Sequence, residues 1–167
     1  MKNSNDIALI APPWWLIPSD NTVTATEHLV EDYAYHLKRL GYSSVIFSRK
    51  RDSTDRFGIS DINRYSNTHI YIKVSKIDRR CFRKNSIFFY LIYILKVSCK
   101  INRLGIRKVI VFQTFPFCFW IKVFNPKSKV LFHIGGHELS KNGNYFNYGY
   151  ISDRLGKVVL KEIDYVI

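Results

Sequence analysis

Cysteine is scarce in this sequence, and long apolar runs are missing. Only three of the 167 residues are cysteines, which is too few for a disulfide framework or a cysteine-based zinc site. The longest apolar run, Ile87–Leu95, falls well short of the roughly 20 residues that a membrane-spanning helix needs. The apolar run Ile7–Ala11 is too short for a signal peptide. The sequence therefore predicts a cytoplasmic protein, either free or peripheral on the inner face of a membrane.

Glycine is missing where a nucleotide-binding loop would need it. The chain has 8 glycines, but none lies between Pro12 and Ala25, in the loop after the first apolar run. Neither a G-x-G-x-x-G fingerprint nor a Walker loop occurs there. Ser140 lacks the glycine spacing of a G-x-S-x-G elbow, and no other pairing of a nucleophile with a base stands out. We therefore expect no bound cofactor.

Acidic residues are few, and the excess of positive charge is concentrated in one segment. The chain has 13 Asp and Glu against 26 Lys and Arg, a formal net charge of +13. Residues 73–108 hold eleven basic residues and a single acid, Asp78. Hydrophobic residues make up 47% and charged residues 23%, which is typical of a globular domain and excludes a disordered chain. The length fits one domain, residues 1–167.

Short apolar runs alternate with helical patterns along the chain. The run Ile7–Ala11 is followed by apolar residues at helical spacing from Leu29 to Leu40, and Gly41 stands where a helix cap belongs. Further strands are predicted at 45–47, 69–74, 109–112, 129–134 and 164–167, with helices at 79–104 and 115–124. Strands that alternate with helices imply a parallel sheet. We therefore predict an α/β fold, a Rossmann-like doubly wound parallel sheet.

Two loops at the predicted carboxyl ends of strands carry candidate ligand-binding residues, because open α/β sheets bind ligands there. His137 and Glu138 follow the strand at 129–134, after a glycine pair that allows close approach to the backbone. His133 lies inside that strand and is more typical of a packed core histidine. We expect no metal site from His133, His137 and Glu138, because this spacing suits a helix and the segment is strand and turn.

The loop after the first predicted strand ends at a helix N-terminus, which is a place for an anion or a sugar ring. Its two tryptophans can stack on a sugar, and its Asp and Asn can hydrogen-bond to hydroxyl groups; alternatively, the tryptophans pack on the sheet edge. The candidate ligand-binding residues of the two loops are Trp14, Trp15, Asp20, Asn21, Gly135 and Gly136.

The segment 79–108 is both basic and apolar, since basic residues flank Ile87–Leu95 on both sides. Such a helix can lie in a membrane interface that carries anionic headgroups. The alternative is a core helix with solvated basic ends. Nucleic acid is disfavoured, because the aromatic residues cluster in one helix rather than along a strand platform. Membrane binding would use Arg79, Arg80, Arg83, Lys84, Phe88, Phe89, Lys96 and Lys100.

The order of elements resembles a known family. Residues Ile7–Trp14, the loop, and the helix that leads through Gly41 to Phe47 are similar to the opening of family-four glycosyltransferases. The segments 108–113, 125–138 and 163–167 match the later strands of that family in order. The resemblance covers nearly all of the chain, and the ordering of strands carries it rather than one motif.

The resemblance implies the N-terminal, acceptor-side domain of a GT-B glycosyltransferase, which is one half of a two-domain fold. Such transferases move a sugar from a nucleotide-sugar donor to a sugar or lipid-linked acceptor without a metal, as in cell-envelope or polysaccharide biosynthesis. Many dock on membranes through a basic, apolar helix of this domain. The donor-binding domain is absent from residues 1–167, so we expect transfer only with a donor-binding domain or subunit as partner.

The resemblance also implies where catalysis would be centred. The histidine that the family usually has at the end of the strand 129–134 aligns with Gly135, between His133 and His137. We take His137 and Glu138 as the catalytic candidates. The rival hypothesis is a non-catalytic basic module that binds a membrane surface or a partner protein.

Overall fold

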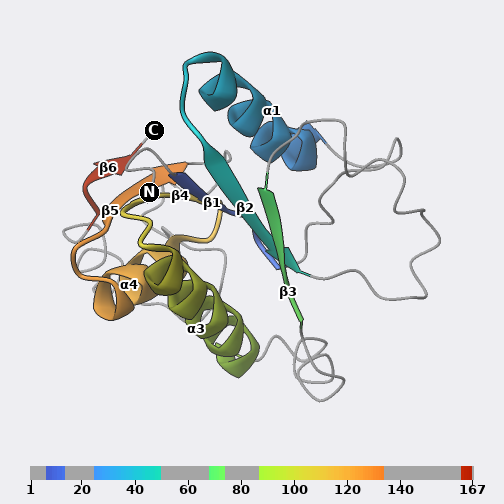
Figure 1. Cartoon of the computed structure of the whole chain (residues 1–167). Helices are drawn as coiled ribbons and strands as arrows, with labels where there is room; N and C mark the ends of the chain where they lie inside the picture. Colours follow the sequence, from blue (N-terminus) through green and yellow to red (C-terminus); the bar gives the residue numbers. More distant parts are fainter. Residues whose placement is uncertain (1–6, 14–24, 50–67, 74–86, 134–162, 167) are drawn as a thin grey trace.

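The computed structural model describes residues 7–13, 25–49, 68–73, 87–133 and 163–166 (Figure 1). In chain order the elements are β1 (Ile7–Ile10), α1 (Ala25–Arg39), β2 (Ser44–Arg49), β3 (Thr68–Ile72), α3 (Ile87–Leu104), β4 (Lys108–Phe112), α4 (Phe115–Phe124), β5 (Lys129–His133) and β6 (Tyr165–Val166). The strands and helices predicted from the sequence are therefore confirmed where the structure describes them. The first part of the predicted helix at 79–104 lies outside the described residues.

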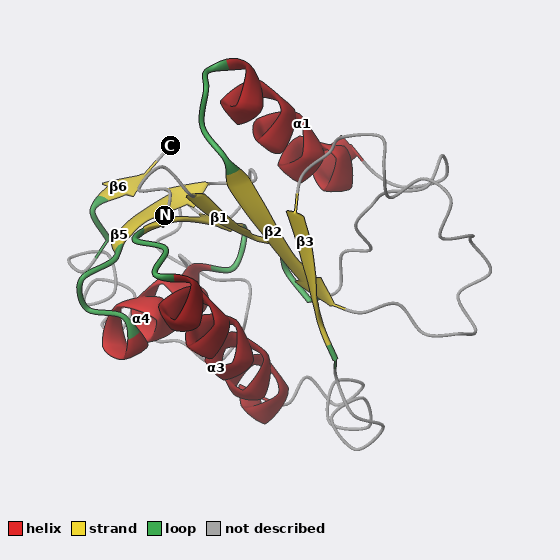
Figure 2. Cartoon of the chain, in the orientation of Figure 1, coloured by secondary structure: helices red, strands yellow, loops and turns green. Residues whose placement is uncertain are grey.

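The strands form one six-stranded sheet in the order β3-β2-β1-β4-β5-β6, and every pairing in it is parallel. The chain winds outward from β1 through β2 to β3, and then starts again at β4 on the other side of β1. Helix α1 covers one face of the sheet, and α3 and α4 cover the other (Figure 2). This arrangement confirms the predicted α/β fold, a Rossmann-like doubly wound parallel sheet.

The hydrophobic core consists of two layers, one on each face of the sheet. Val30 and Ala34 of α1 pack with Leu9 on one face, while Ala8 and Ile10 pack toward α3 and α4 on the other. Residues of β1 thus alternate between the two layers, as the pleat of a strand requires. Because helices cover both faces, every residue of β1 is buried, which explains why the run is apolar without interruption.

Both long helices end at a glycine in the left-handed region. At the end of α3, Gly105 has φ +69°, its N–H donates to the Asn102 carbonyl, and the Ile106 N–H donates to the Ile101 carbonyl. These two bonds form a Schellman motif, and the buried side chains of Ile101 and Ile106 join the same core layer. Helix α1 ends in the same way at Gly41, with φ +81°. The sequence-based prediction that Gly41 and Gly105 end these helices is confirmed.

The short strand β6 extends the sheet beyond β5. Before it, the Asp164 carboxylate accepts a hydrogen bond from the Val130 N–H at 2.6 Å and forms an ion pair with Lys122 of α4 at 2.9 Å. One side chain therefore joins the carboxyl end of the described chain to both β5 and α4. The strand predicted at 164–167 is confirmed.

Candidate ligand site at the carboxyl edge of the sheet

The order of the strands reverses between β1 and β4, which are hydrogen-bonded neighbours. The connections that leave these two strands run to opposite faces, since α1 follows β1 and α4 follows β4 (Figure 1). Ligands of doubly wound folds bind in the crevice that such a reversal opens at the carboxyl edge. The described residues at this edge come from the ends of β1, β2, β4 and β5 and from the helices above them.

Tyr93 of α3 anchors the ends of β1 and β2. Its side chain is fully buried, and its hydroxyl lies 3.1 Å from the Ala11 carbonyl oxygen and 3.3 Å from that of Phe47, so one proton is shared between two acceptors. The Ala11 N–H also donates to the Phe47 carbonyl. Burial raises the pKa of Tyr93 far above its ordinary value, although the charge of Arg49 opposes the shift. The phenol is therefore a permanent donor.

Gln113 and Thr114 form the turn between β4 and α4. Gln113 has a positive φ of 51°, which is uncommon for a residue other than glycine, and its N–H donates to the His133 carbonyl at the end of β5. Thr114 stands at the N-cap of α4, where its carbonyl accepts from the Phe117 N–H. The residue is 4% exposed, and its Oγ1 has no hydrogen-bond partner among the described residues. A buried hydroxyl without a partner is rare, and a ligand at this edge would satisfy it.

An aromatic cluster backs the edge at the ends of β4 and β5. The ring of Tyr33 from α1 meets those of Phe112 and His133 edge-on, with centroids 5.2 Å away in each case. The rings of Phe112 and His133 lie 5.3 Å apart. Burial raises the pKa of Tyr33. These contacts support the interpretation of His133 as a packed histidine, since its ring is one side of a three-ring cluster.

Charged groups approach the edge from β2 and α1. Arg49 ends β2, and its Nε is buried without a hydrogen-bond partner in the described part of the chain. In the first half of α1, the buried Glu31 lies 3.6 Å from Nδ1 of His28, whose side chain is about half exposed. Because α1 follows β1, its first half is the end that lies toward the carboxyl edge.

The described groups at this edge are suited to binding oxygen atoms. Arg49 supplies a guanidinium, Thr114 supplies a hydroxyl, and the N-terminus of α4 adds the positive end of a helix dipole. Pro116 in the first turn of α4 removes one backbone donor. Within residues 7–13, 25–49, 68–73, 87–133 and 163–166, no group of three or more His, Cys, Asp or Glu is placed to hold a metal ion. The edge therefore suits a ligand rich in hydroxyl groups or an oxyanion.

Most of the site residues predicted from the sequence lie outside the described residues. They are the catalytic candidates His137 and Glu138, the acceptor-binding candidates Trp14, Trp15, Asp20, Asn21, Gly135 and Gly136, and the basic residues Arg79, Arg80, Arg83 and Lys84. The described backbone nevertheless leads to both loops at one edge, because Pro13 follows β1 and His133 ends β5.

Helix α3 combines a buried face with a basic one. Phe88 and Phe89 belong to its first turn, while Lys96 and Lys100 are exposed. On the opposite face, Ile94, Val97 and Ile101 are fully buried against the sheet. This packing supports the core-helix alternative for the described part of the segment. Among the described residues, none of the helices has both the length and the apolar content that crossing a membrane requires.

The exposed face of α3 borders a groove of about 560 Å³ against the edge strand β3. Lys96 donates from Nζ to the Lys73 carbonyl at 3.0 Å across this groove. The lining residues are Tyr71, Ile72, Lys73, Leu95, Lys96, Cys99, Lys100 and Arg103. The lining therefore combines apolar residues with four cationic ones.

Sequence reasoning missed Tyr93, Thr114 and Arg49 as residues of the edge. A signal existed for Thr114, because Gln113-Thr114 is a polar pair between an apolar strand and a helix with Pro116 in its first turn. Arg49 likewise follows an apolar strand directly. Tyr93 gave no signal, since it is one of several aromatic residues within an apolar helix.

The chain was compared with family models, curated proteins and solved structures, and none of them matches it.

Proposed function

We propose that the chain is the acceptor-side domain of a GT-B glycosyltransferase, which transfers a sugar only when a donor-binding domain completes it. The carboxyl edge would hold the sugar or lipid-linked acceptor, with His137 and Glu138 as catalytic candidates. A nucleotide-sugar would be the substrate contributed through the second domain. The role in cell-envelope or polysaccharide glycan synthesis belongs to the same proposal.

One observation carries this proposal: the strand order reverses at β1 and β4, and the edge there presents donors for oxygen atoms. The buried Thr114 hydroxyl lacks a partner in the described part of the chain, and Arg49 adds a positive charge at the end of β2. Acceptor hydroxyl groups are ligands of the kind that these groups bind. The order of strands also agrees with the order that the resemblance to family-four glycosyltransferases requires.

Saccharide binding by the chain tests this proposal. Amide resonances are followed by NMR during titration with glucose, N-acetylglucosamine and UDP-glucose. We expect a saccharide to shift the amide resonances of Ala11, Gln113 and Thr114. UDP-glucose should shift no amides other than those that glucose shifts. If no saccharide perturbs this edge, the acceptor-side assignment is wrong and the rival, a non-catalytic module, is favoured.

A pair of hydroxyl deletions sharpens the test. Thr114→Val keeps the shape of the side chain but removes the hydroxyl, and we expect saccharide affinity to fall about three- to tenfold, because one hydrogen bond is lost. Ser98→Ala is the matched control, since the Ser98 Oγ is also buried without a partner among the described residues but lies within α3. Equal affinity losses in both variants would contradict a specific role for Thr114.

We also propose that the basic face of α3 holds the domain against an anionic membrane surface. The groove between α3 and β3 supports this, because its lining combines apolar residues with four cationic ones. Each cation near such a surface contributes about 1 kcal/mol of attraction. Sedimentation with phosphatidylglycerol vesicles is expected to fall strongly in the double variant K96Q/K100Q. The control K38Q/R39Q removes the same charge from α1, on the other face of the sheet, and should bind as the unmodified chain does.

The membrane proposal fails in two cases. One is that binding is equally strong to neutral phosphatidylcholine vesicles; the other is that a nucleic-acid competitor abolishes it. The second outcome would instead assign the basic face to a phosphate backbone, with affinity that falls steeply with salt.

A further inference from the structure

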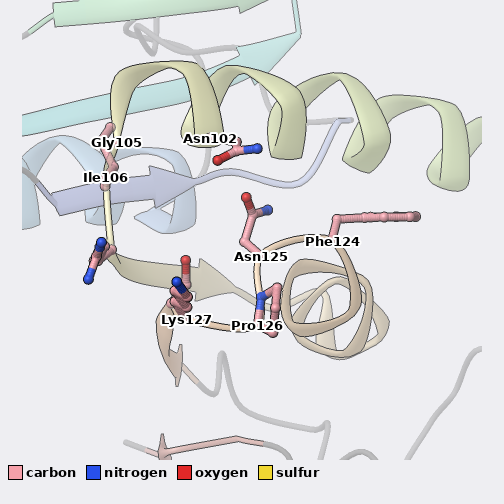
Figure 3. Close-up of a pocket in the computed structure, with 9 residues that line it drawn as sticks. Asn102, Gly105, Ile106, Phe124, Asn125, Pro126 and Lys127 are labelled. Atoms are coloured by element: carbon pink, nitrogen blue, oxygen red, sulfur yellow. The ribbon is translucent and has the colours of Figure 1, made fainter.

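A separate pocket of about 490 Å³ lies at the opposite, amino edge of the sheet, between the end of α3 and the turn that joins α4 to β5. Its volume is within the range of small-molecule sites. The side chains of Asn102 and Asn125 project into the space between α3 and the turn, while the Phe124 ring extends away from them (Figure 3). The lining residues are Asn102, Gly105, Ile106, Arg107, Phe124, Asn125, Pro126, Lys127 and Ser128.

The walls of the pocket are held in place by backbone hydrogen bonds. On one side, the glycine-terminated end of α3 is closed by the Schellman motif. On the other side, the Asn125 N–H donates to the Ile121 carbonyl, and the Ser128 N–H donates to that of Asn125. The Lys129 N–H donates to the Arg107 carbonyl at 2.7 Å and joins the two sides. The site is therefore preorganised.

Asn125 provides the observation that points to a ligand. The residue is 8% exposed, and its Nδ2 is buried without a hydrogen-bond partner among the described residues. An amide nitrogen is only a donor, so the missing partner is an acceptor such as an oxygen atom. A buried donor without a partner costs about 1–3 kcal/mol, which a ligand oxygen would relieve.

The charge of the pocket selects an anion. Arg107 and Lys127 are its charged lining residues, and no acid lines it. Residues 87–133 contain no Asp or Glu at all. Asp164, which precedes β6, forms an ion pair with Lys122 and accepts a hydrogen bond from the Val130 N–H. At these two helix ends, the carbonyls of Ile101, Asn102 and Ile121 already accept backbone hydrogen bonds.

We infer that this pocket binds the phosphate group of a small phosphate ester. Arg107 and Lys127 match the charge of a phosphate dianion, and a guanidinium can bind two phosphate oxygens at once. Asn125 Nδ2 donates to a further oxygen, and Asn102 lies where it can contact the ester's organic part. The site is distinct from the carboxyl edge, because the two lie at opposite ends of the parallel strands.

The test is an NMR titration at constant ionic strength with inorganic phosphate, glucose 6-phosphate and glucose. We expect the two phosphates, but not glucose, to shift the amides of residues 102–107, 124–125 and 127–128. Arg107→Gln should weaken binding about tenfold, because a charge-assisted hydrogen bond is lost. Asn125→Ala should weaken it severalfold, with amide protection of the sheet used to verify folding.

The matched control is Arg39→Gln, which removes one exposed guanidinium from α1 outside this pocket and outside the groove beside β3. We expect its affinity to stay within twofold of that of the unmodified chain. Equal weakening by Arg39→Gln and Arg107→Gln would overturn the inference, because only the overall charge would then matter. Binding to vesicles that contain phosphatidic acid, with no response to soluble phosphates, would also overturn it and would assign the cations to a lipid surface.

Discussion

At the scale of single residues, two buried hydroxyl groups at the carboxyl edge behave differently. The Tyr93 hydroxyl is shared between two backbone carbonyls and fixes the ends of β1 and β2. The Thr114 hydroxyl has no partner in the described part of the chain and remains available to a ligand. One residue therefore builds the edge, while the other can serve binding there.

Replacing Tyr93 by Phe tests this structural role. The variant leaves the carbonyls of Ala11 and Phe47 without their shared donor, so the free energy of unfolding should fall by about 1–3 kcal/mol. Urea unfolding provides the measurement. Tyr35→Phe is the control, because that ring is 45% exposed on α1 and its change should stay within about 0.5 kcal/mol. Equal effects in both variants would show that the Tyr93 hydrogen bonds contribute nothing.

At the scale of elements, the two long helices end in the same way but differ in the side chains that they place around the sheet. Glycines in the left-handed region close α1 and α3, so each chain segment turns directly into the next strand. Helix α1 brings Glu31 and Tyr33 toward the carboxyl edge, whereas α3 buries one face and exposes a basic one. The helix ends therefore set where the next strand begins, and the helix faces supply side chains to the candidate sites.

The glycine endings can be tested at Gly41. A Cβ atom there would meet nothing within 4 Å, so Gly41→Ala adds no clash and only the left-handed backbone opposes it. We expect a loss of about 1 kcal/mol in the free energy of unfolding. Gly41→Asn should lose less, because asparagine tolerates this conformation better. If alanine and asparagine cost the same, backbone conformation is not the reason for glycine.

At the scale of the whole molecule, the sheet offers two edges with different chemistry. The carboxyl edge gathers Arg49, Thr114 and an aromatic cluster around the reversal of strand order. The amino edge carries a cationic pocket formed by the ends of α3 and α4. Because all strands run in parallel, the two sites lie at opposite ends of the strands. Variants at one site should therefore leave ligand binding at the other unchanged.

Asp164 links the last strand to the rest of the molecule, and its ionisation makes this link dependent on pH. Partial burial alone would raise its pKa, but the hydrogen bond from Val130 and the Lys122 charge outweigh it and lower the pKa. A lowered pKa means that the folded state favours the carboxylate. Its contribution to stability is therefore present above about pH 4 and is lost as the pH falls through the folded pKa.

Urea unfolding at pH 7 and at pH 3 measures this contribution. Asp164→Asn should be less stable than the unmodified chain at pH 7, and the difference should shrink at pH 3. Asp32→Asn removes an exposed carboxylate from α1 and should change the free energy of unfolding at pH 7 by no more than about 0.5 kcal/mol. A constant difference between Asp164→Asn and the unmodified chain at both pH values would contradict the proposed ionic link.

The fold was predictable because its signals are local. The apolar run at β1 indicates a strand covered on both faces, and the glycines at 41 and 105 mark helix ends through their own backbone preference. The candidate site was predictable only in its general place, since strand ends follow from the order of elements. The residues chosen for it from their chemistry, such as His137, lie outside the described residues and remain predictions.

The amino-acid sequence by itself determined the alternation of strands and helices, the glycine ends and the concentration of positive charge. These properties depend on neighbours within a few residues, so a linear pattern contains them. Only the tertiary structure decided which distant groups meet. Tyr93 reaches Ala11 across 82 residues, and Asp164 reaches Val130 across 34. Asn102 and Asn125 likewise line one pocket from different helix ends. Such contacts depend on the order and register of strands, which bring together segments that no local pattern connects.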